Sequence, residues 1–259
     1  MPINLAEHER GAPFAGDYAA AITGLQDRLA RLQRAQLVHR KRVVIVLEGP
    51  EGAGKTSALK RIGAGFDPCH YAVHCVAPDR RLSAEGHWLA RFWSRLPGAG
   101  HTAIFYDSWY RRVLEDRVMG LVAEKEWRRG FDEINEFEAQ QCDYGTLLIK
   151  LYFHATDRVL DERIAERAAD PWQRHLLGPA ELRSAEGRAA YREALAQMFK
   201  QNDTRWAPWT AVDANDKPAA RIAALNVIAE AIARHVPAEP PEQVERGASF
   251  ARRAAGMSA

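Results

Sequence analysis

Continuous apolar runs alternate along this chain with segments in which apolar residues recur at helical spacing. The run VVIVLE, at residues 43–48, is too short for an ordinary helix and too uniformly apolar for a half-exposed strand. It therefore predicts a parallel strand that is buried on both faces. Similar runs predict four more strands, at YAVHCV (71–76), TAIFY (102–106), TLLIKLYF (146–153) and TAVDAND (210–216).

Helical patterns fill the intervals between these runs. Residues 18–42 predict an amphipathic helix that ends in the basic sequence HRKR, and residues 218–235 predict a last helix. The segment 156–200 is helix-rich and arginine-rich and is broken by DP and GP dipeptides, which predicts a mobile helical lid. The alternation of strand and helix predicts a three-layer α/β fold with a parallel sheet.

Length and composition favour one folded domain. The chain has 259 residues, of which 47% are hydrophobic, enough for a sizeable core and too many for a disordered chain. We expect the domain to cover residues 15–235, with the lid at about 156–200, after an N-terminal tail at residues 1–14. Residues 236–259 contain prolines and charges with little apolar periodicity, so we expect a loosely ordered C-terminal tail.

Charge and cysteine content bear on whether the protein binds nucleic acid and on the compartment in which it works. The net charge of +2 is the small difference between 36 basic and 34 acidic residues, so we expect no nucleic-acid partner. Three cysteines, an odd number, do not make a disulfide framework, and we expect a reducing, cytoplasmic location. The polar N-terminus and the lack of a stretch approaching roughly 20 apolar residues predict neither export nor membrane association.

A phosphate-loop motif is the strongest chemical signal. The sequence GPEGAGKT, at residues 49–56, matches GxxxxGK[ST] in every fixed position, and it lies between a predicted buried strand and a predicted helix, TSALKRIGAG. Glycines let the backbone curl so that several N–H groups point at one anion, and the helix N-terminus adds partial positive charge. The alternative is a glycine-rich turn that matches by chance. The residues predicted to bind phosphate are Gly49, Glu51, Gly52, Ala53, Gly54, Lys55 and Thr56.

Candidate metal ligands accompany this loop. Lys55 is predicted to neutralise the phosphoryl group in transfer, and Thr56 is predicted to hold magnesium. Asp107 follows the apolar run TAIFY at the carboxyl edge of a strand, where α/β sheets bind ligands, so it is predicted to be a second metal ligand. It also precedes a helical run, so a helix cap is the alternative to the metal role, and we expect both roles to hold together. Glu51 is either a magnesium ligand or a solvent-facing acid, since a carboxylate near phosphates is unfavourable without a cation.

Arginines near the predicted strand end are candidates for stabilising charge on the phosphoryl group. Arg112 and Arg117 lie on the helix predicted after TAIFY, with Asp116 between them. We predict that both arginines are catalytic and that Asp116 and Arg91 contact the acceptor. The alternative for the two arginines is a solvated helix face.

The predicted lid contains three further arginines, Arg163, Arg167 and Arg174, each a candidate clamp on a polyanion. The alternative is that they are held by neighbouring acids such as Glu162 and Glu166, which would relieve the like-charge pair formed by Arg163 and Arg167. We expect at least one of the three to act on the substrate.

Two other residue clusters are assigned to packing. In an extended strand, the cysteines of CHYAVHC, Cys69 and Cys75, would lie roughly 20 Å apart, which is too far for them to share a metal ion. Trp88, Phe92 and Trp93 fall at helical spacing and are predicted to be core residues, with a base-stacking platform as the alternative.

Five segments in this order resemble the family-2 polyphosphate kinases, over roughly residues 15–235: LEGPEGAGKTSALKRI, HWLARFWSRLPGAG, IFYDSWYRRVLEDRV, EINEFEAQQCDYGTLLIKLYFH and RWAPWTAVDANDK. The resemblance implies a thymidylate-kinase-like P-loop kinase fold with a helical lid. It also implies Mg²⁺-dependent transfer of phosphate between inorganic polyphosphate and a nucleoside mono- or diphosphate, in a homo-oligomer that is a dimer or a tetramer. Basic residues near the site, including Lys60 and Arg61, are then candidates for the polyphosphate track.

The resemblance also exposes departures from the family pattern. The family's phosphate-loop acid, usually Asp, falls on Glu51 and its lysine on Lys55, but Thr56 stands where a second glycine is usual. Where the family has an acid and then an arginine before Ser-Trp-Tyr, this chain has Tyr106 and Asp107. In the lid the usual Trp-Lys pair is replaced by His-Leu. Later positions that match the pattern are Arg112, Asp116, Arg117, Asp170, Pro171 and Arg174.

The displaced strand-end acid bears directly on activity. Side chains alternate between faces along a strand, so moving the acid by one residue turns it away unless the strand has ended or bulged. We expect a phosphotransferase that uses Lys55, magnesium and Asp107. Two alternatives remain: an ATP-dependent kinase of a nucleotide or small metabolite, suggested by Thr56, and a catalytically silent polyphosphate- or nucleotide-binding protein, suggested by the missing strand-end arginine.

Overall fold

A five-stranded parallel sheet lies at the centre of the computed structural model, which describes residues 3–77 and 86–241. The strands lie in the order β2-β3-β1-β4-β5. Every predicted strand is confirmed to within a few residues of its expected ends. Their bounds are β1 Arg42–Glu48, β2 Tyr71–Cys75, β3 Thr102–Tyr106, β4 Thr146–His154 and β5 Trp209–Asp213.

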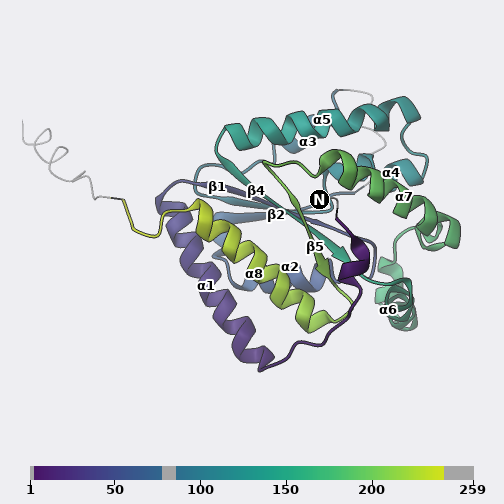
Figure 1. Cartoon of the computed structure of the whole chain (residues 1–259), viewed down its shortest axis with the longest axis horizontal. Helices are drawn as coiled ribbons and strands as arrows, with labels where there is room; N and C mark the ends of the chain where they lie inside the picture. Colours follow the sequence, from purple (N-terminus) through teal and green to yellow (C-terminus); the bar gives the residue numbers. More distant parts are fainter. Residues whose placement is uncertain (1–2, 78–85, 242–259) are drawn as a thin grey trace, which may run out of the picture.

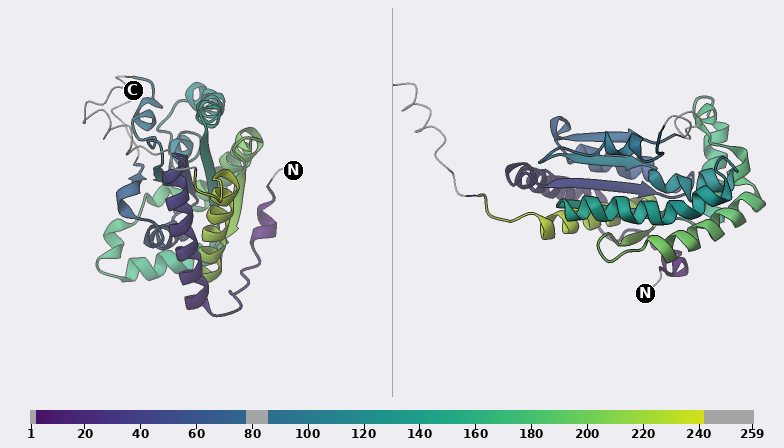
Figure 2. Two further views of the ribbon diagram at one scale, coloured as in Figure 1. Left: turned by 90° about the vertical axis from the view of Figure 1, so that its left-hand side faces the viewer. Right: turned by 90° about the horizontal axis from the view of Figure 1, so that it is seen from above.

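Helices connect the strands and cover both faces of the sheet (Figures 1 and 2). The α-helices are α1 Tyr18–Val38, α2 Lys55–Ala64, α3 Ala90–Trp93, α4 Glu115–Val118, α5 Glu124–Asp143, α6 Asp157–Ala169, α7 Ala185–Asn202 and α8 Lys217–His235. The described 3₁₀ turns are η1 Leu5–His8, η2 Pro68–His70, η4 Trp109–Arg112, η5 Gln173–Leu176 and η6 Ala180–Arg183.

The buried residues of β1 show why its sequence is continuously apolar. Val43, Ile45 and Leu47 join the core cluster formed with α1, α2 and α8. Val44 and Val46 point to the opposite face and join the cluster formed with α3, α5 and α7. Both faces of the central strand are therefore covered, and the expected three-layer α/β architecture is confirmed.

The strand register places the carboxyl ends of β1 and β3 next to each other. Leu47 of β1 pairs with Tyr106 of β3, so the residues that follow, Glu48 and Asp107, lie side by side at one edge of the sheet. The phosphate loop leaves the sheet at this same edge. Parallel pairing thus brings residues far apart in the chain to one place, where α/β folds bind their ligands.

The predicted lid consists of two parts with different surroundings. Helical structure runs through α6, η5, η6 and α7 as expected, and none of the described residues from 164 to 190 is buried. The second half of α7 differs, because Leu195, Met198 and Phe199 belong to the core. Residues 164–190, rather than all of residues 156–200, are therefore the part of the predicted lid that contributes no buried residue to the core.

The N-terminal segment, expected as a tail over residues 1–14, contacts the ends of two strands. Its Gly11 N–H donates to Asp213 at 2.8 Å, and Glu9 accepts from His154 at 2.9 Å. Both partners end neighbouring strands. The C-terminal tail expected from residue 236 lies mostly outside the described residues, although Val236 itself is buried. In the described part of the chain, no helix combines the length and apolar character needed to cross a bilayer.

Two packing predictions need correction. Cys69 and Cys75 are exposed, because Cys69 lies in η2 and Cys75 ends the edge strand β2, which is mostly open to solvent. Trp88 and Phe92 are buried as predicted, but Trp93 is 47% exposed. The helical stretch there is only α3, a single turn, and the Trp93 ring at its end rests against Phe137 at the rim of the core.

A buried charge network joins the sheet to α5. The ammonium of Lys150, on β4, lies 2.8 Å from the Glu138 carboxylate, and both side chains are 0% exposed. The ammonium also donates to the Tyr110 hydroxyl and to the carbonyl of Asn202, each at 2.9 Å. Burial lowers the pKa of Lys150, and Glu138 opposes that effect. Three hydrogen bonds satisfy the cation, which makes its burial tolerable.

Lys150→Met is expected to lower the free energy of unfolding by about 3–5 kcal/mol, because it leaves the Glu138 carboxylate buried without a cation. Urea unfolding monitored by circular dichroism measures the change. Lys200→Met, at an exposed position of α7, is the matched control and should change stability little. Adding Glu138→Leu to the first variant should restore part of the loss. An unchanged unfolding midpoint for Lys150→Met would contradict the role of this network.

Candidate active site

The phosphate loop has the backbone that its glycines predict. Gly49, Gly52 and Gly54 adopt φ values of +142°, +87° and +98°, a region that residues with a side chain rarely enter. A Cβ atom on Gly49 would also lie 2.5 Å from the carbonyl oxygen of Phe153, so that position cannot hold a larger residue without rearrangement. The loop leads directly into α2, which begins at Lys55.

Lys55 is buried at the centre of the site, with 5% of its surface exposed. Its ammonium donates to the Gly49 carbonyl and, at 2.5 Å, to the Asp107 carboxylate. Burial alone would lower the pKa of Lys55, but Asp107, Tyr106 and Glu48 outweigh it and raise the pKa. The side chain therefore remains a cation, and its ammonium lies at the phosphate loop.

Asp107 reaches Lys55 because β3 has already ended. The residue adopts a left-handed conformation with φ +56°, uncommon for a residue with a side chain, and its N–H donates to the Leu47 carbonyl at 3.1 Å. This turn brings the displaced acid to the phosphate loop. The expected cap is wrong, since Ser108 is the N-cap of η4 and accepts the N–H of Tyr110.

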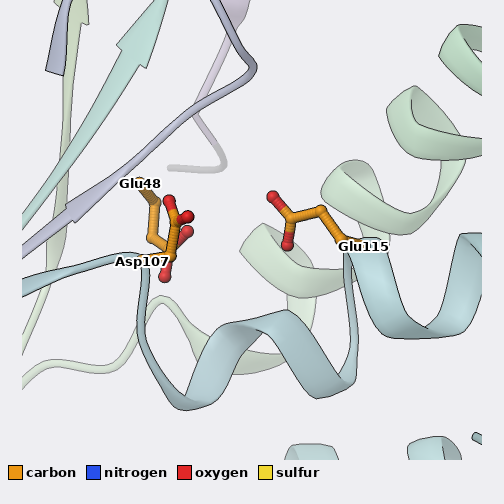
Figure 3. Close-up of side chains that lie close together, drawn as sticks. All are labelled: Glu48, Asp107 and Glu115. Carbon is orange, nitrogen blue, oxygen red and sulfur yellow. The ribbon is translucent and has the colours of Figure 1, made fainter. Parts of the chain in front are cut away.

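Three carboxylates converge at this edge of the sheet: Glu48, Asp107 and Glu115 (Figure 3). One oxygen from each lies within 4.8 Å of the others. Glu48 is fully buried and Glu115 is 6% exposed, and one oxygen of each, Oε2, has no hydrogen-bond partner. Buried oxygens of this kind are costly unless a cation or proton satisfies them.

The pKa values in the cluster report the same crowding. Burial and the charges of Asp107 and Glu115 raise the pKa of Glu48 well above its usual range. Burial, followed by the charge of Asp107, raises the pKa of Glu115 to about 7. Oxygen donors gathered in this way suit a hard divalent cation.

Sequence reasoning missed two members of this cluster. Glu48 ends the apolar run of β1 just as Asp107 follows that of β3, so the signal that selected Asp107 could have found it. Glu115 has no comparable signal, because it lies in an arginine-rich stretch and reaches the cluster only through the path of the chain between η4 and α4.

The other two predicted metal ligands point elsewhere in this structure. Glu51 accepts the N–H of Gly178 at 3.1 Å and the guanidinium of Arg183 at 3.0 Å, and Arg167 lies 3.6 Å away. Thr56 donates its hydroxyl to that of Tyr106 at 3.1 Å. Of the predicted ligands, Asp107 is the one that joins the acidic cluster. Arg183, which sequence reasoning missed, lies beyond the dipeptide breaks.

The arginines near the strand end do not form the single solvated helix that was the alternative. Arg112 is buried, lies over the Trp88 ring and is 3.7 Å from Glu126. Arg117 lies over the Trp127 ring at 3.9 Å and donates to Gln197 at 2.8 Å. A 3₁₀ turn and the short α4 replace the expected helix, and each guanidinium turns to a neighbouring helix instead of the acidic cluster.

Arg111, which sequence reasoning did not single out, is an arginine that lies beside the strand-end acid. Its guanidinium is 3.8 Å from Asp107 and donates to Asp116 at 3.0 Å. Asp116, predicted to contact the acceptor, is therefore paired within the protein. Arg91 lies over the Phe92 ring at 4.7 Å.

The lid arginines have separate environments. Arg163 is buried and donates to the carbonyls of Gly52, Ala214 and Asn215 at 2.8–3.0 Å. Its guanidinium therefore holds the backbone of the phosphate loop, an arrangement that differs from the clamp proposed for it. Arg174 is exposed in η5. The predicted track residues are also exposed, on α2, and these are Lys60 and Arg61.

Comparison with known proteins identifies the family. The sequence model for polyphosphate kinase 2 (PPK2) matches residues 15–240. The chain is 35% identical over 83% of its length to a polyphosphate:AMP phosphotransferase of Pseudomonas syringae pv. tomato, of which it covers 43%. It is 35% identical over 80% of its length to ADP-polyphosphate phosphotransferase 2 of Rhizobium meliloti, of which it covers 67%. The chain spans about half the length of the Pseudomonas relative.

A solved structure agrees with the sequence comparisons. The polyphosphate kinase 2 structure from Pseudomonas aeruginosa PA01 superposes with a TM-score of 0.81 at 33% identity, over 87% of this chain and 48% of that one. The match over residues 15–240, together with this fold, shows that the chain belongs to the polyphosphate kinase 2 family.

Proposed function

We propose that this protein transfers phosphoryl groups between inorganic polyphosphate and a nucleoside mono- or diphosphate. One observation carries the proposal: a buried lysine of the phosphate loop lies 2.5 Å from a strand-end carboxylate, in a chain of the polyphosphate kinase 2 family. Two relatives are named as phosphotransferases between polyphosphate and AMP or ADP, and these names support polyphosphate and a nucleotide as the substrates.

Mg²⁺ is the metal that fits the acidic cluster. Glu48, Asp107 and Glu115 would hold it, because they supply oxygen donors and two of their buried oxygens have no other partner. When bound, the ion would neutralise phosphate charge and orient the phosphate chain. The metal ligand roles predicted for Glu51 and Thr56 have no comparable support in this arrangement.

The chain's own groups would do the remaining work. The N–H groups of the curled loop and the N-terminus of α2 attract a phosphate. The Lys55 ammonium would exchange Asp107 for a phosphoryl oxygen and stabilise the charge that spreads over the transferred group. Arg111, beside Asp107, would keep that carboxylate oriented while Lys55 moves. Catalysis would then rest on positioning and charge stabilisation, without a covalent intermediate.

A donor and acceptor panel tests the proposal. Long-chain polyphosphate and ATP are supplied in turn as donors with Mg²⁺, and AMP, ADP, GMP and GDP as acceptors. Polyphosphate-dependent formation of a nucleotide is the expected result. Transfer from ATP alone would instead identify an ATP-dependent kinase. Tight binding without transfer from either donor would identify a silent binding protein.

We further propose a cytoplasmic protein that forms a homo-oligomer, either a dimer or a tetramer. The family resemblance supports the assembly, and free, exposed thiols such as Cys69 and Cys75 fit a reducing compartment. Light scattering coupled to size-exclusion chromatography measures the assembly directly. A monomeric mass at micromolar concentration would overturn that part of the proposal.

A further inference from the structure

The lid holds a carboxylate of the phosphate loop in the manner of a bound anion. Glu51 accepts the N–H of Gly178 on both carboxylate oxygens, at 3.1 Å each. Arg183 donates to Oε2 at 3.0 Å, and Arg167 lies 3.6 Å from Oε1. Two guanidinium groups and one backbone N–H thus surround a single acid. We call the three groups that face Glu51 the lid cradle: Arg167, Gly178 N–H and Arg183.

The cradle is built for close approach. Gly178 lies so near to Glu51 that a Cβ atom on this glycine would be 3.2 Å from Oε2. A contact that short would require the Glu51 side chain to shift. Arg183 also donates to the Gly178 carbonyl, which ties the guanidinium to the same turn. Guanidinium forks and backbone N–H groups are the groups that proteins use to bind phosphate.

Phosphate bound at the loop would repel the Glu51 carboxylate, which lies in the lid cradle. Glu51 belongs to the phosphate loop itself, so phosphate bound there adds negative charge near its carboxylate. The contacts that hold the lid are partly exposed, with 34% and 23% of the Arg167 and Arg183 side chains accessible. Ion pairs of that kind contribute little, so a polyanion can replace one partner.

We propose that the lid cradle is a binding site for one phosphoryl unit of an inorganic polyphosphate chain, and that Glu51 occupies this site until polyphosphate displaces it. The inference rests on the proposed function for the identity of the ligand. It assigns Arg183 and the Gly178 N–H to substrate binding, and it makes Glu51 an internal competitor that keeps the lid on the phosphate loop when no polyanion is present.

The test uses the full chain with tripolyphosphate as the probe, without nucleotide or metal, at low salt. Calorimetry measures affinity, and hydrogen exchange of residues 173–184 reports on the lid. Glu51→Gln should bind tripolyphosphate about 5-fold more tightly or better, because the competing charge is gone. In the absence of ligand, its lid amides should exchange faster than those of the unaltered protein. Arg183→Gln should bind about 10-fold more weakly.

Arg158→Gln is the matched control, since it removes an exposed arginine of α6 that pairs with Glu162 and not with Glu51. It should leave both readouts almost unchanged. If Arg183→Gln does not fold, as judged by thermal unfolding, Arg183→Lys takes its place and should still weaken binding. Equal or weaker binding by Glu51→Gln overturns the competitor role, and unaltered binding by the Arg183 variant overturns the cradle. These readouts need no catalysis, so they stand apart from the transfer panel.

Discussion

Lys55→Ala is expected to lower transfer from polyphosphate by about 1000-fold or more. The ammonium is the buried cation of the phosphate loop, and it is positioned by Gly49 and Asp107. Under the proposed function, it would stabilise the charge that develops on the transferred phosphate. A charge of this kind acts strongly because burial keeps water away from it. Initial rates of nucleotide formation at saturating polyphosphate measure the effect.

Two controls keep the result interpretable. Lys125→Ala removes an exposed lysine from α5 and should retain activity, which separates the site from a general loss of positive charge. Thermal unfolding should show that Lys55→Ala still folds, because glycine conformations and core packing shape the loop. Turnover within 10-fold of the unaltered protein, in a folded variant, would contradict the site assignment; that margin is about 1.4 kcal/mol of transition-state stabilisation.

Asp107→Asn is expected to lower transfer by on the order of 100-fold and to raise the Mg²⁺ concentration that transfer requires. The substitution preserves shape but removes one of the three converging carboxyl groups and the partner of Lys55. Glu115→Gln should change the Mg²⁺ requirement in the same direction, although no sequence pattern singles that residue out. Rates measured across a Mg²⁺ titration report both effects.

A ligand-binding readout separates metal binding from catalysis. Mg²⁺ should raise the unfolding temperature of the unaltered protein, because it binds the folded cluster and not the unfolded chain. The increase should be smaller in Asp107→Asn and in Glu115→Gln. Asp132→Asn, at an exposed position of α5, should behave like the unaltered protein. Unchanged Mg²⁺ dependence in both cluster variants would remove the metal from this site.

The geometry around Asp107 also predicts what happens when the acid is moved from position 107 to position 106. Adding Tyr106→Asp to Asp107→Asn recreates the family's acid position but should not restore transfer. Tyr106 is the last residue of β3 and its hydroxyl meets Thr56, whereas the left-handed turn at residue 107 is what directs a carboxylate to Lys55. Full recovery of transfer would show that residue 106 reaches the cluster equally well.

The fold could be predicted because its causes are local or periodic. A strand buried on both faces needs a continuous apolar run, and each of the five runs became a strand. The phosphate loop was recognisable because its left-handed positions require glycine, and Gly49, Gly52 and Gly54 occupy them. Predictions failed where the pattern was weak: α3 is a single turn, and Trp93 therefore lies at the surface.

The site could be predicted only in part. Lys55 and Asp107 carry signals of their own, one in a motif and one at a strand end. The contacts of Glu51 with Arg183 and of Glu115 with the strand-end acids carry none, because each joins residues whose separation in the chain follows no period. Arg163 shows the converse, since its position in the lid sequence suggested a clamp whereas its guanidinium supports the loop backbone.

The amino-acid sequence by itself determined the parallel sheet, the phosphate loop and Lys55, because backbone sterics and burial act on neighbouring residues and leave a period or a motif. Only the tertiary structure decided that the displaced acid lies beside Lys55. The end of β3 and the left-handed conformation of Asp107 turn its carboxylate toward Lys55, where Glu48 and Glu115 meet it. The charge balance of the site depends on distances between side chains from separate elements, and those distances exist only once the chain has folded.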